Sequence, residues 1–192
     1  MSRFLRWISV FAVVLALTSC SAEKQSPPES VKSSPVEYGY PADYRAKPIY
    51  LQAAVLTEHF PELKPMFPFG DMEKPKGAEG LFIIPQWQAL APTYGEAVEK
   101  VFAKLAEQRP FSNWLKGKLG SHHLRQTGHS QTMWKRLAEA QGNAGILLVP
   151  AQFGLRYRGK SVKEARASFA DNEFGLGAYE VGIMLLTHPE RL

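Results

Sequence analysis

The chain has 192 residues, of which 45% are apolar, and it carries 23 basic against 18 acidic side chains, a formal net charge of +5. A chain of this length and apolar content can bury one sizeable hydrophobic core. Cys20 is the only cysteine, which excludes a fold held by disulfide bonds within the chain.

The first twenty residues have the organisation of an export signal. Arg3 and Arg6 precede an eleven-residue apolar run from Trp7 to Leu17, and small residues lead from there to Cys20. A helix needs roughly 20 apolar residues to cross a hydrocarbon core of about 30 Å, so this run is too short to span a membrane. We therefore expect a cleaved signal and a mature protein that works outside the cytoplasm.

Residues Leu17 to Cys20 resemble the lipobox of bacterial lipoproteins. The resemblance implies that residues 1–19 are removed and that Cys20 becomes the first mature residue, with lipid on its sulfur and its amine. Several acyl chains on one residue anchor a protein firmly, because each buried methylene contributes about 0.8 kcal/mol. Ser21, in place of an aspartate, implies the periplasmic face of the outer membrane. An ordinary secretory signal with an incidental cysteine is the alternative.

Residues 20–48 have the composition of a lipidated, disordered tether. Prolines interrupt a stretch rich in Ser, Glu and Lys that has almost no aliphatic side chains, so no packed element can form. A polyproline-like chain of this length would reach up to about 85 Å and hold the body clear of the lipid. Four tyrosines near its distal end are expected to pack against the body, or to form a stacking surface for sugar or peptide: Tyr38, Tyr40, Tyr44 and Tyr50.

The globular body is expected over residues 49–192. Residues 49–60 lack Gly and Pro and stop at Pro61, which predicts a helix. Residues 61–80, with four prolines and three glycines, predict a long irregular loop, and residues 81–84 predict a short buried strand. Thr93 and Glu96 form a capping-box pattern, and the apolar spacing that follows predicts a helix bounded by Pro110.

Residues 111–166 are strongly basic. They hold ten basic residues against two acidic ones, a net charge of +8. A clustered positive field attracts anionic partners, and the candidate residues for such binding lie near the end of the segment: Arg156, Arg158, Lys160, Lys163 and Arg166. The alternative is that folding interleaves these cations with acidic residues from the flanking segments.

Helices beginning at Ser112 and Ser130 are expected within this segment. His122, His123 and His129 lie nearby, and imidazole is a common metal ligand. However, no cysteine or acidic residue occurs between Glu107 and Glu139, so we expect surface or capping histidines and no metal site.

Residues 154–161 match the phosphate-loop pattern G-x-x-x-x-G-K-S letter for letter. We do not expect a nucleotide here, because residues 155–157 have the alternation of a strand and only 31 residues follow Ser161. Two extended runs, 146–153 and 155–157, are expected to meet at Gly154. A helix opened by the capping box Ser161-x-x-Glu164 should follow, and its free amides could hold a phosphate or carboxylate; an ordinary solvated turn is the alternative.

Residues 172–188 favour a buried helix ended by Pro189, with Gly175, Ala178 and Gly182 on one stripe that allows close packing. A fully buried strand from Val181 to Leu186 is the alternative. Residues 174–178 and the apolar run after them resemble the glycine-rich segment of lytic transglycosylases. The resemblance would imply Glu173 as a general acid, but it covers fewer than twenty residues and lacks the Glu-Ser pair of that family. Residues 152–192 also resemble uncharacterised proteins of bacterial mobile elements.

These observations predict a single α+β domain with four to six helices and a sheet of two to four strands. No sequence motif identifies catalytic residues, and no cofactor is expected. The predicted function is that of an envelope lipoprotein that binds an anionic partner: a cell-wall polymer, lipopolysaccharide or a protein of an envelope-spanning assembly. A peptidoglycan hydrolase or lyase and a lipoprotein of a conjugation or secretion apparatus are the alternatives. A pocket holding Glu173 or Glu180 beside a histidine would favour the enzyme.

Overall fold

The computed structural model describes residues 45–64, 72–113, 124 and 126–191. Within them the chain forms five α-helices, two strands and three short 3₁₀ turns, which confirms the α+β class. The α-helices are α1 (Ile49–His59), α2 (Tyr94–Gln108), α3 (Gly128–Ala140), α4 (Val162–Ala167) and α5 (Ala178–Thr187). The remaining elements are β1 (Gly80–Pro85), β2 (Ile146–Ala151), η1 (Trp87–Ala89), η2 (Leu155–Tyr157) and η3 (Pro189–Arg191).

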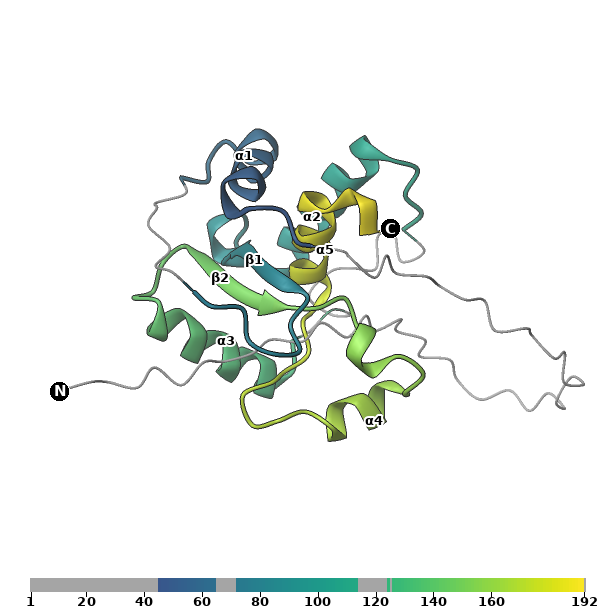
Figure 1. The fold of residues 1–192 in the computed structure, drawn as a ribbon. Coiled ribbons are helices and arrows are strands. Elements are labelled where there is room, and N and C mark those ends of the chain that lie inside the picture. The colour runs from purple at the N-terminus through teal and green to yellow at the C-terminus, as the bar shows by residue number, and fades with distance from the viewer. Residues whose placement is uncertain (1–44, 65–71, 114–123, 125, 192) are drawn as a thin grey trace, which may run out of the picture.

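The two strands form the centre of the molecule. They pair antiparallel, from Gly80 opposite Ala151 to Pro85 opposite Ile146. Figure 1 shows α1, α2 and α5 gathered above the strands, α3 below them and α4 apart from the other helices. Because helices cover both faces of the sheet, every residue of β2 is buried, and β1 is buried at all positions but Leu81.

Both edges of this small sheet are covered by glutamine side chains. On the β1 edge, the Gln52 amide donates to the Leu81 carbonyl at 2.9 Å and accepts from the Ile83 amide at 3.1 Å. On the β2 edge, Gln141 makes the same pair of bonds with the backbone of Leu148, both at 2.8 Å. Unpaired strand edges expose backbone groups that would otherwise recruit another strand, so these two glutamines end the sheet at two strands.

The predicted helix and strand boundaries are confirmed where proline or a capping residue marks them. Helix α1 ends at His59, before Pro61, and β1 covers the predicted strand. Helix α2 begins after Thr93, whose hydroxyl accepts the Glu96 amide proton. The predicted helix after Ser112 lies largely in residues 114–123, outside the described residues, as does part of the predicted loop before β1.

Three sequence predictions were wrong. Residues 155–157 form the turn η2 rather than an extended run, because Gly154 adopts a φ of 100° and the Tyr157 amide bonds back to its carbonyl at 3.0 Å. Helix α3 starts two residues before Ser130, and its N-cap is Thr127, whose hydroxyl accepts the Ser130 amide proton at 3.1 Å. Helix α5 starts only at Ala178, so Gly175 does not share its stripe with Gly182.

Candidate functional site

The predicted anion-binding residues surround η2 and α4. Gly154 and Gly159, with φ of 100° and 80°, turn the chain before each of these elements. Both halves of the capping box between Ser161 and Glu164 are present, at 3.3 and 2.8 Å, and start α4 as predicted. A small separate cluster of Tyr157, Ala165 and Phe169 packs beneath the helix. This cluster holds α4 as a satellite of the main core.

Arg156 is bound to an acidic residue. Its guanidinium donates to Glu173 Oε1 at 2.7 Å, and Glu173 is only 5% exposed. The other carboxylate oxygen of Glu173 accepts the Tyr157 hydroxyl at 2.8 Å and the Ala170 amide at 3.1 Å. A buried carboxylate without its cation is strongly destabilising. Arg156 therefore stabilises the attachment of η2 to the segment before α5, and its charge is largely balanced.

Lys160 also has neighbours within its own segment. Its Nζ lies 5.7 Å from the centroid of the Tyr157 ring and 3.0 Å from Ser168 Oγ. Burial raises the pKa of the Tyr157 hydroxyl to about 12, and the hydrogen bond to Glu173 adds to the increase, so the ring beside Lys160 stays neutral. Lys160 lies at the surface, and these contacts fix the position of its ammonium group.

The other three of the five predicted anion-binding residues are available to a partner. Arg158, Lys163 and Arg166 are exposed, and none forms an ion pair with any part of the chain that the structure describes. The nearest acidic residue in sequence, Glu164, has its carboxylate bonded to the helix cap. We call Arg158, Lys163 and Arg166 the α4 surface.

The α4 surface borders a pocket of about 480 Å³. Arg166 and Phe169 line one part of it, His129 and Ser130 at the start of α3 line another, and Glu173 belongs to its wall. The pocket thus contains one of the two glutamates singled out in the sequence together with a histidine. Both oxygens of Glu173 are already engaged by the chain, so in this arrangement its carboxylate acts as a hydrogen-bond acceptor.

The phosphate-loop pattern does not form a phosphate cradle. The strand before it, β2, belongs to a two-stranded antiparallel sheet, and the helix after it, α4, has only six residues. A nucleotide-binding loop of this type instead joins a strand to a helix whose N-terminal amides converge on the phosphates. The residues between Gly154 and Gly159 form the turn η2.

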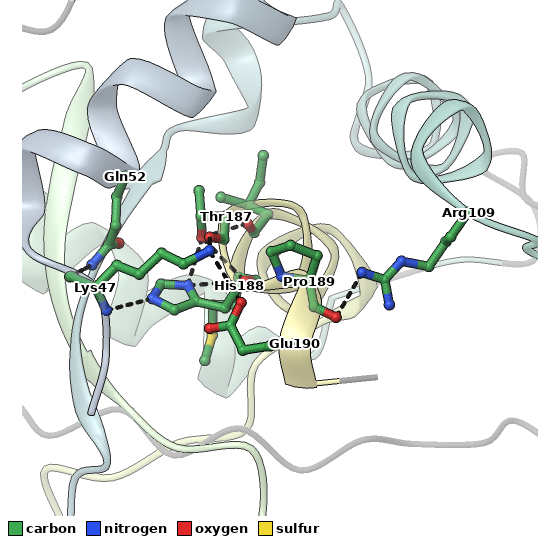
Figure 2. Close-up of polar contacts among 9 residues, drawn as sticks. Lys47, Gln52, Arg109, Thr187, His188, Pro189 and Glu190 are labelled. Carbon is green, nitrogen blue, oxygen red and sulfur yellow. Dashed lines mark hydrogen bonds and ion pairs between the residues drawn. The ribbon is translucent and has the colours of Figure 1, made fainter. Parts of the chain in front are cut away.

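A second polar cluster joins the end of the predicted tether to the C-terminal end of α5 (Figure 2). The Lys47 amide donates to His188 Nε2 at 3.0 Å, and its ammonium reaches the Thr187 carbonyl and Glu190 Oε2, both at 3.0 Å. Gln52 accompanies them through a 2.7 Å bond to the Lys47 carbonyl. We call this cluster the tether junction; it fixes the point where the predicted tether enters the body.

His188 has a defined protonation state in the tether junction. Because Nε2 accepts the Lys47 amide proton, the ring proton must sit on Nδ1, which lies 2.8 Å from Thr187 Oγ1 and 3.2 Å from the Met184 carbonyl. Burial lowers the pKa of His188 to about 4, so the ring is neutral at physiological pH. Sequence inspection had not singled out His188 or Lys47.

Other sequence predictions fall outside this description. Cys20, the lipobox, His122 and His123 all belong to stretches that the structure does not describe. Of the predicted tyrosine group only Tyr50 is described, and it is 67% exposed on α1. Among the described residues no three His, Cys, Asp or Glu side chains gather in a way that could hold a metal ion. None of the described helices is both long enough and apolar enough to cross a bilayer.

No protein-family model, curated protein or solved structure matches this chain.

Proposed function

We propose that the protein is a lipoprotein of the bacterial cell envelope, anchored through Cys20, that binds an anionic envelope component through the α4 surface. The observation that carries this proposal is the group of three exposed cations, Arg158, Lys163 and Arg166, without an ion pair among the described residues. Isolated exposed ion pairs contribute only about 0–1 kcal/mol to stability. Uncompensated cations on one short segment are therefore better explained by association with an anion than by folding.

The five predicted anion-binding residues fall into two groups, one that contacts the rest of the segment and one that is available to a partner. Arg156 neutralises the buried Glu173, and Lys160 lies on Tyr157, so these two contribute to the structure of the segment. The α4 surface forms no ion pair with the described residues, and its helix is held by its own capping box and satellite cluster. A change of charge on the α4 surface should therefore leave the fold intact.

Charge reversal tests the proposal. The triple variant Arg158→Glu, Lys163→Glu, Arg166→Glu should lose at least about tenfold in co-sedimentation with isolated sacculi or with vesicles containing lipopolysaccharide. The matched control reverses three exposed cations elsewhere in the chain, Lys64 and Lys76 in loops and Arg136 on α3, and so makes the same change in net charge. Equal loss in both variants, or no loss in the first, would contradict binding at the α4 surface.

Each arm of this experiment identifies a different partner. Binding to sacculi indicates a cell-wall polymer, and binding to vesicles indicates lipopolysaccharide. If neither is bound, capture of an acidic protein of an envelope-spanning assembly, such as a conjugation or secretion apparatus, must depend on the same three residues. Lys160→Ala should lose only a fraction of the affinity, since a distributed charged surface does not depend on one lysine as a phosphate loop does.

A peptidoglycan hydrolase or lyase is the second candidate, and the observation in its favour is that Glu173 and His129 line the same pocket. An active enzyme would release soluble fragments from sacculi, and His129→Gln would abolish the release without unfolding the protein, because His129 is exposed. Intact sacculi after prolonged incubation with the wild-type protein would remove this candidate.

A further inference from the structure

A separate pocket of about 460 Å³ lies between η1, α3 and the N-terminal end of α5. Its volume falls within the roughly 300–1,000 Å³ that is usual for small-molecule sites. Side chains from the two strands, Ile84 and Leu147, form part of its wall together with Glu180. The pocket therefore combines elements that are far apart in the sequence but rigidly packed in the core.

Two tryptophans line this pocket, and both are held in place by neighbouring rings. Trp87 meets Tyr94 edge to face, with ring centroids 6.3 Å apart and an interplanar angle of 89°. Trp134 meets Phe174 in the same way, at 5.5 Å and 82°. The indole nitrogen of Trp134 is buried and has no hydrogen-bond acceptor among the described residues. Fixed indole rings provide flat apolar surface next to a hydrogen-bond donor.

Side-chain amides supply most of the polar lining. Gln88, Gln131 and Asn143 reach the pocket, and in the described part of the chain none of these amides is hydrogen-bonded. Each amide offers a donor and an acceptor in one plane. Such groups suit a ligand whose own groups both donate and accept, as hydroxyl groups do.

Glu180 places a single carboxyl group in the wall. Its Oε2 accepts the Tyr94 hydroxyl and the Gly177 amide, both at 2.9 Å. Among the side chains that the structure describes, its Oε1 accepts only the Gln126 amide, also at 2.9 Å. A carboxylate oxygen can accept two hydrogen bonds, so Oε1 keeps capacity for a further donor. Burial raises the pKa of Glu180 to about 7, which lets the group serve as donor or acceptor near neutral pH.

The charge of the pocket excludes a strongly ionic ligand. Apart from Glu180, its only charged lining residue within the described chain is Lys135, whose side chain is 79% exposed and lies 4.0 Å from Glu139. A phosphate or a metal ion would need several converging charges. The lining instead matches a neutral ring with an apolar face and hydroxyl groups around its edge.

We propose that this pocket binds a neutral saccharide unit, with Trp87 and Trp134 against its apolar surface and Gln88, Gln131 and Asn143 bonded to its hydroxyl groups. This site is distinct from the α4 surface and does not depend on the function proposed for that surface. The protein would then have a site for a neutral sugar in addition to the cationic α4 surface.

Titration with chitotriose and with maltotriose, followed by calorimetry and by ligand-observed NMR, tests the proposal. The wild-type protein should bind at least one of these neutral oligosaccharides with a dissociation constant below about 10 mM. Gln131→Leu should weaken binding about three- to tenfold, as expected for one lost hydrogen bond, and Trp87→Ala should weaken it further. Gln131 is exposed, so its variant is expected to fold even if the Trp87 variant does not.

Two controls make the result specific. Gln108→Leu replaces another exposed glutamine, at the end of α2 and outside the pocket, and should leave the affinity unchanged. The triple reversal of the α4 surface should also bind the oligosaccharide normally, which separates this proposal from the proposed anionic partner. Absence of binding to both oligosaccharides, or equal affinity in wild type and Gln131→Leu, would overturn the proposal.

Discussion

Two buried titratable residues make the stability of the protein depend on pH in opposite directions. His188 has a pKa of about 4 instead of the usual 6.5, because burial disfavours its charged form. The unfolded chain therefore binds more protons below about pH 6.5, and stability falls as the pH decreases towards 4. Glu180 has a pKa of about 7 instead of 4.5, again through burial. The folded chain then holds the extra proton, and stability rises as the pH decreases from 7 to 4.5.

Replacement of His188 should expose this compensation. In His188→Gln the side chain can still accept a hydrogen bond but cannot titrate, so the loss of stability that His188 causes at low pH is removed while the Glu180 contribution remains. As the pH decreases from 7 to about 4.5, wild type loses stability at His188 and the variant does not. The unfolding free energy of the variant minus that of wild type should therefore rise by about 2 kcal/mol over this range. Urea unfolding at the two pH values measures this difference. His129→Gln, at an exposed histidine, should show no such gain; a His188 variant with the same pH dependence as wild type would show that the buried ring does not control acid stability.

The roles of these two residues could not be predicted from the sequence. The Lys47 amide that fixes the His188 tautomer is 141 positions away, and the Tyr94 hydroxyl that binds Glu180 is 86 positions away. The sequence marks Glu180 only as a candidate carboxylate for a pocket. A glutamate three residues after Gly177 is a helix-cap pattern, which would have placed its carboxyl at the start of α5.

Helices α2 and α5 pack closely because Gly182 has no side chain. A Cβ atom at this position would lie 2.7 Å from Cγ1 of Val101, which is fully buried. Val is β-branched and stiff about χ1, so its methyl group cannot easily move aside. The predicted small-residue stripe was therefore correct at Gly182, although it does not extend to Gly175.

Substitution of Gly182 should disrupt this contact. Gly182→Ala is expected to destabilise the protein by about 1–3 kcal/mol through overpacking, in spite of the better helix propensity of alanine. Val101→Ala in the same chain should recover part of that loss, because it removes the methyl group that clashes. The four chains of this double-mutant cycle can be compared by thermal unfolding. A neutral Gly182→Ala, or strictly additive effects, would argue against the close approach of α2 and α5.

Signals that act within a few residues were sufficient to predict where several helices begin and end. Features that depend on residues distant in the sequence could not be predicted. Proline and capping patterns placed α1, α2 and the start of α4, because those signals act within a few residues. The segment Leu155 to Tyr157 alternates like a strand, but the left-handed conformation of Gly154 converts it into a turn. The glutamines at the sheet edges could not be predicted, since nothing in the sequence links Gln52 or Gln141 to a strand.

For the whole molecule, the last residues of the predicted tether are bound to the body at the tether junction. Lys47 lies two residues before α1, ahead of the N-cap Pro48, and is bound to both Thr187 and Glu190 near the other end of the chain. This attachment fixes the position at which the chain enters the body. The location of the α4 surface relative to the membrane would then depend on the length of the predicted tether.

Removal of the lipid acceptor tests the anchor. Cys20→Ser should release the body into the soluble periplasmic fraction or leave the precursor uncleaved, because no other thiol is present in the chain. Fractionation followed by mass determination distinguishes these forms, and Ser21→Ala serves as the neighbouring control. A mature Cys20 variant that still requires detergent would contradict lipidation at this residue.

The central claim is that the α4 surface binds its partner by charge, and the salt dependence of that binding tests it most directly. Between about 0.1 and about 1 M salt the Debye length falls from about 10 Å to about 3 Å. The affinity of the protein for sacculi or lipopolysaccharide vesicles should fall at least about tenfold over this range, and the Arg158, Lys163, Arg166 reversal should show only the weak, salt-insensitive remainder. An affinity that does not change with salt, or that the reversal leaves intact, would contradict the account.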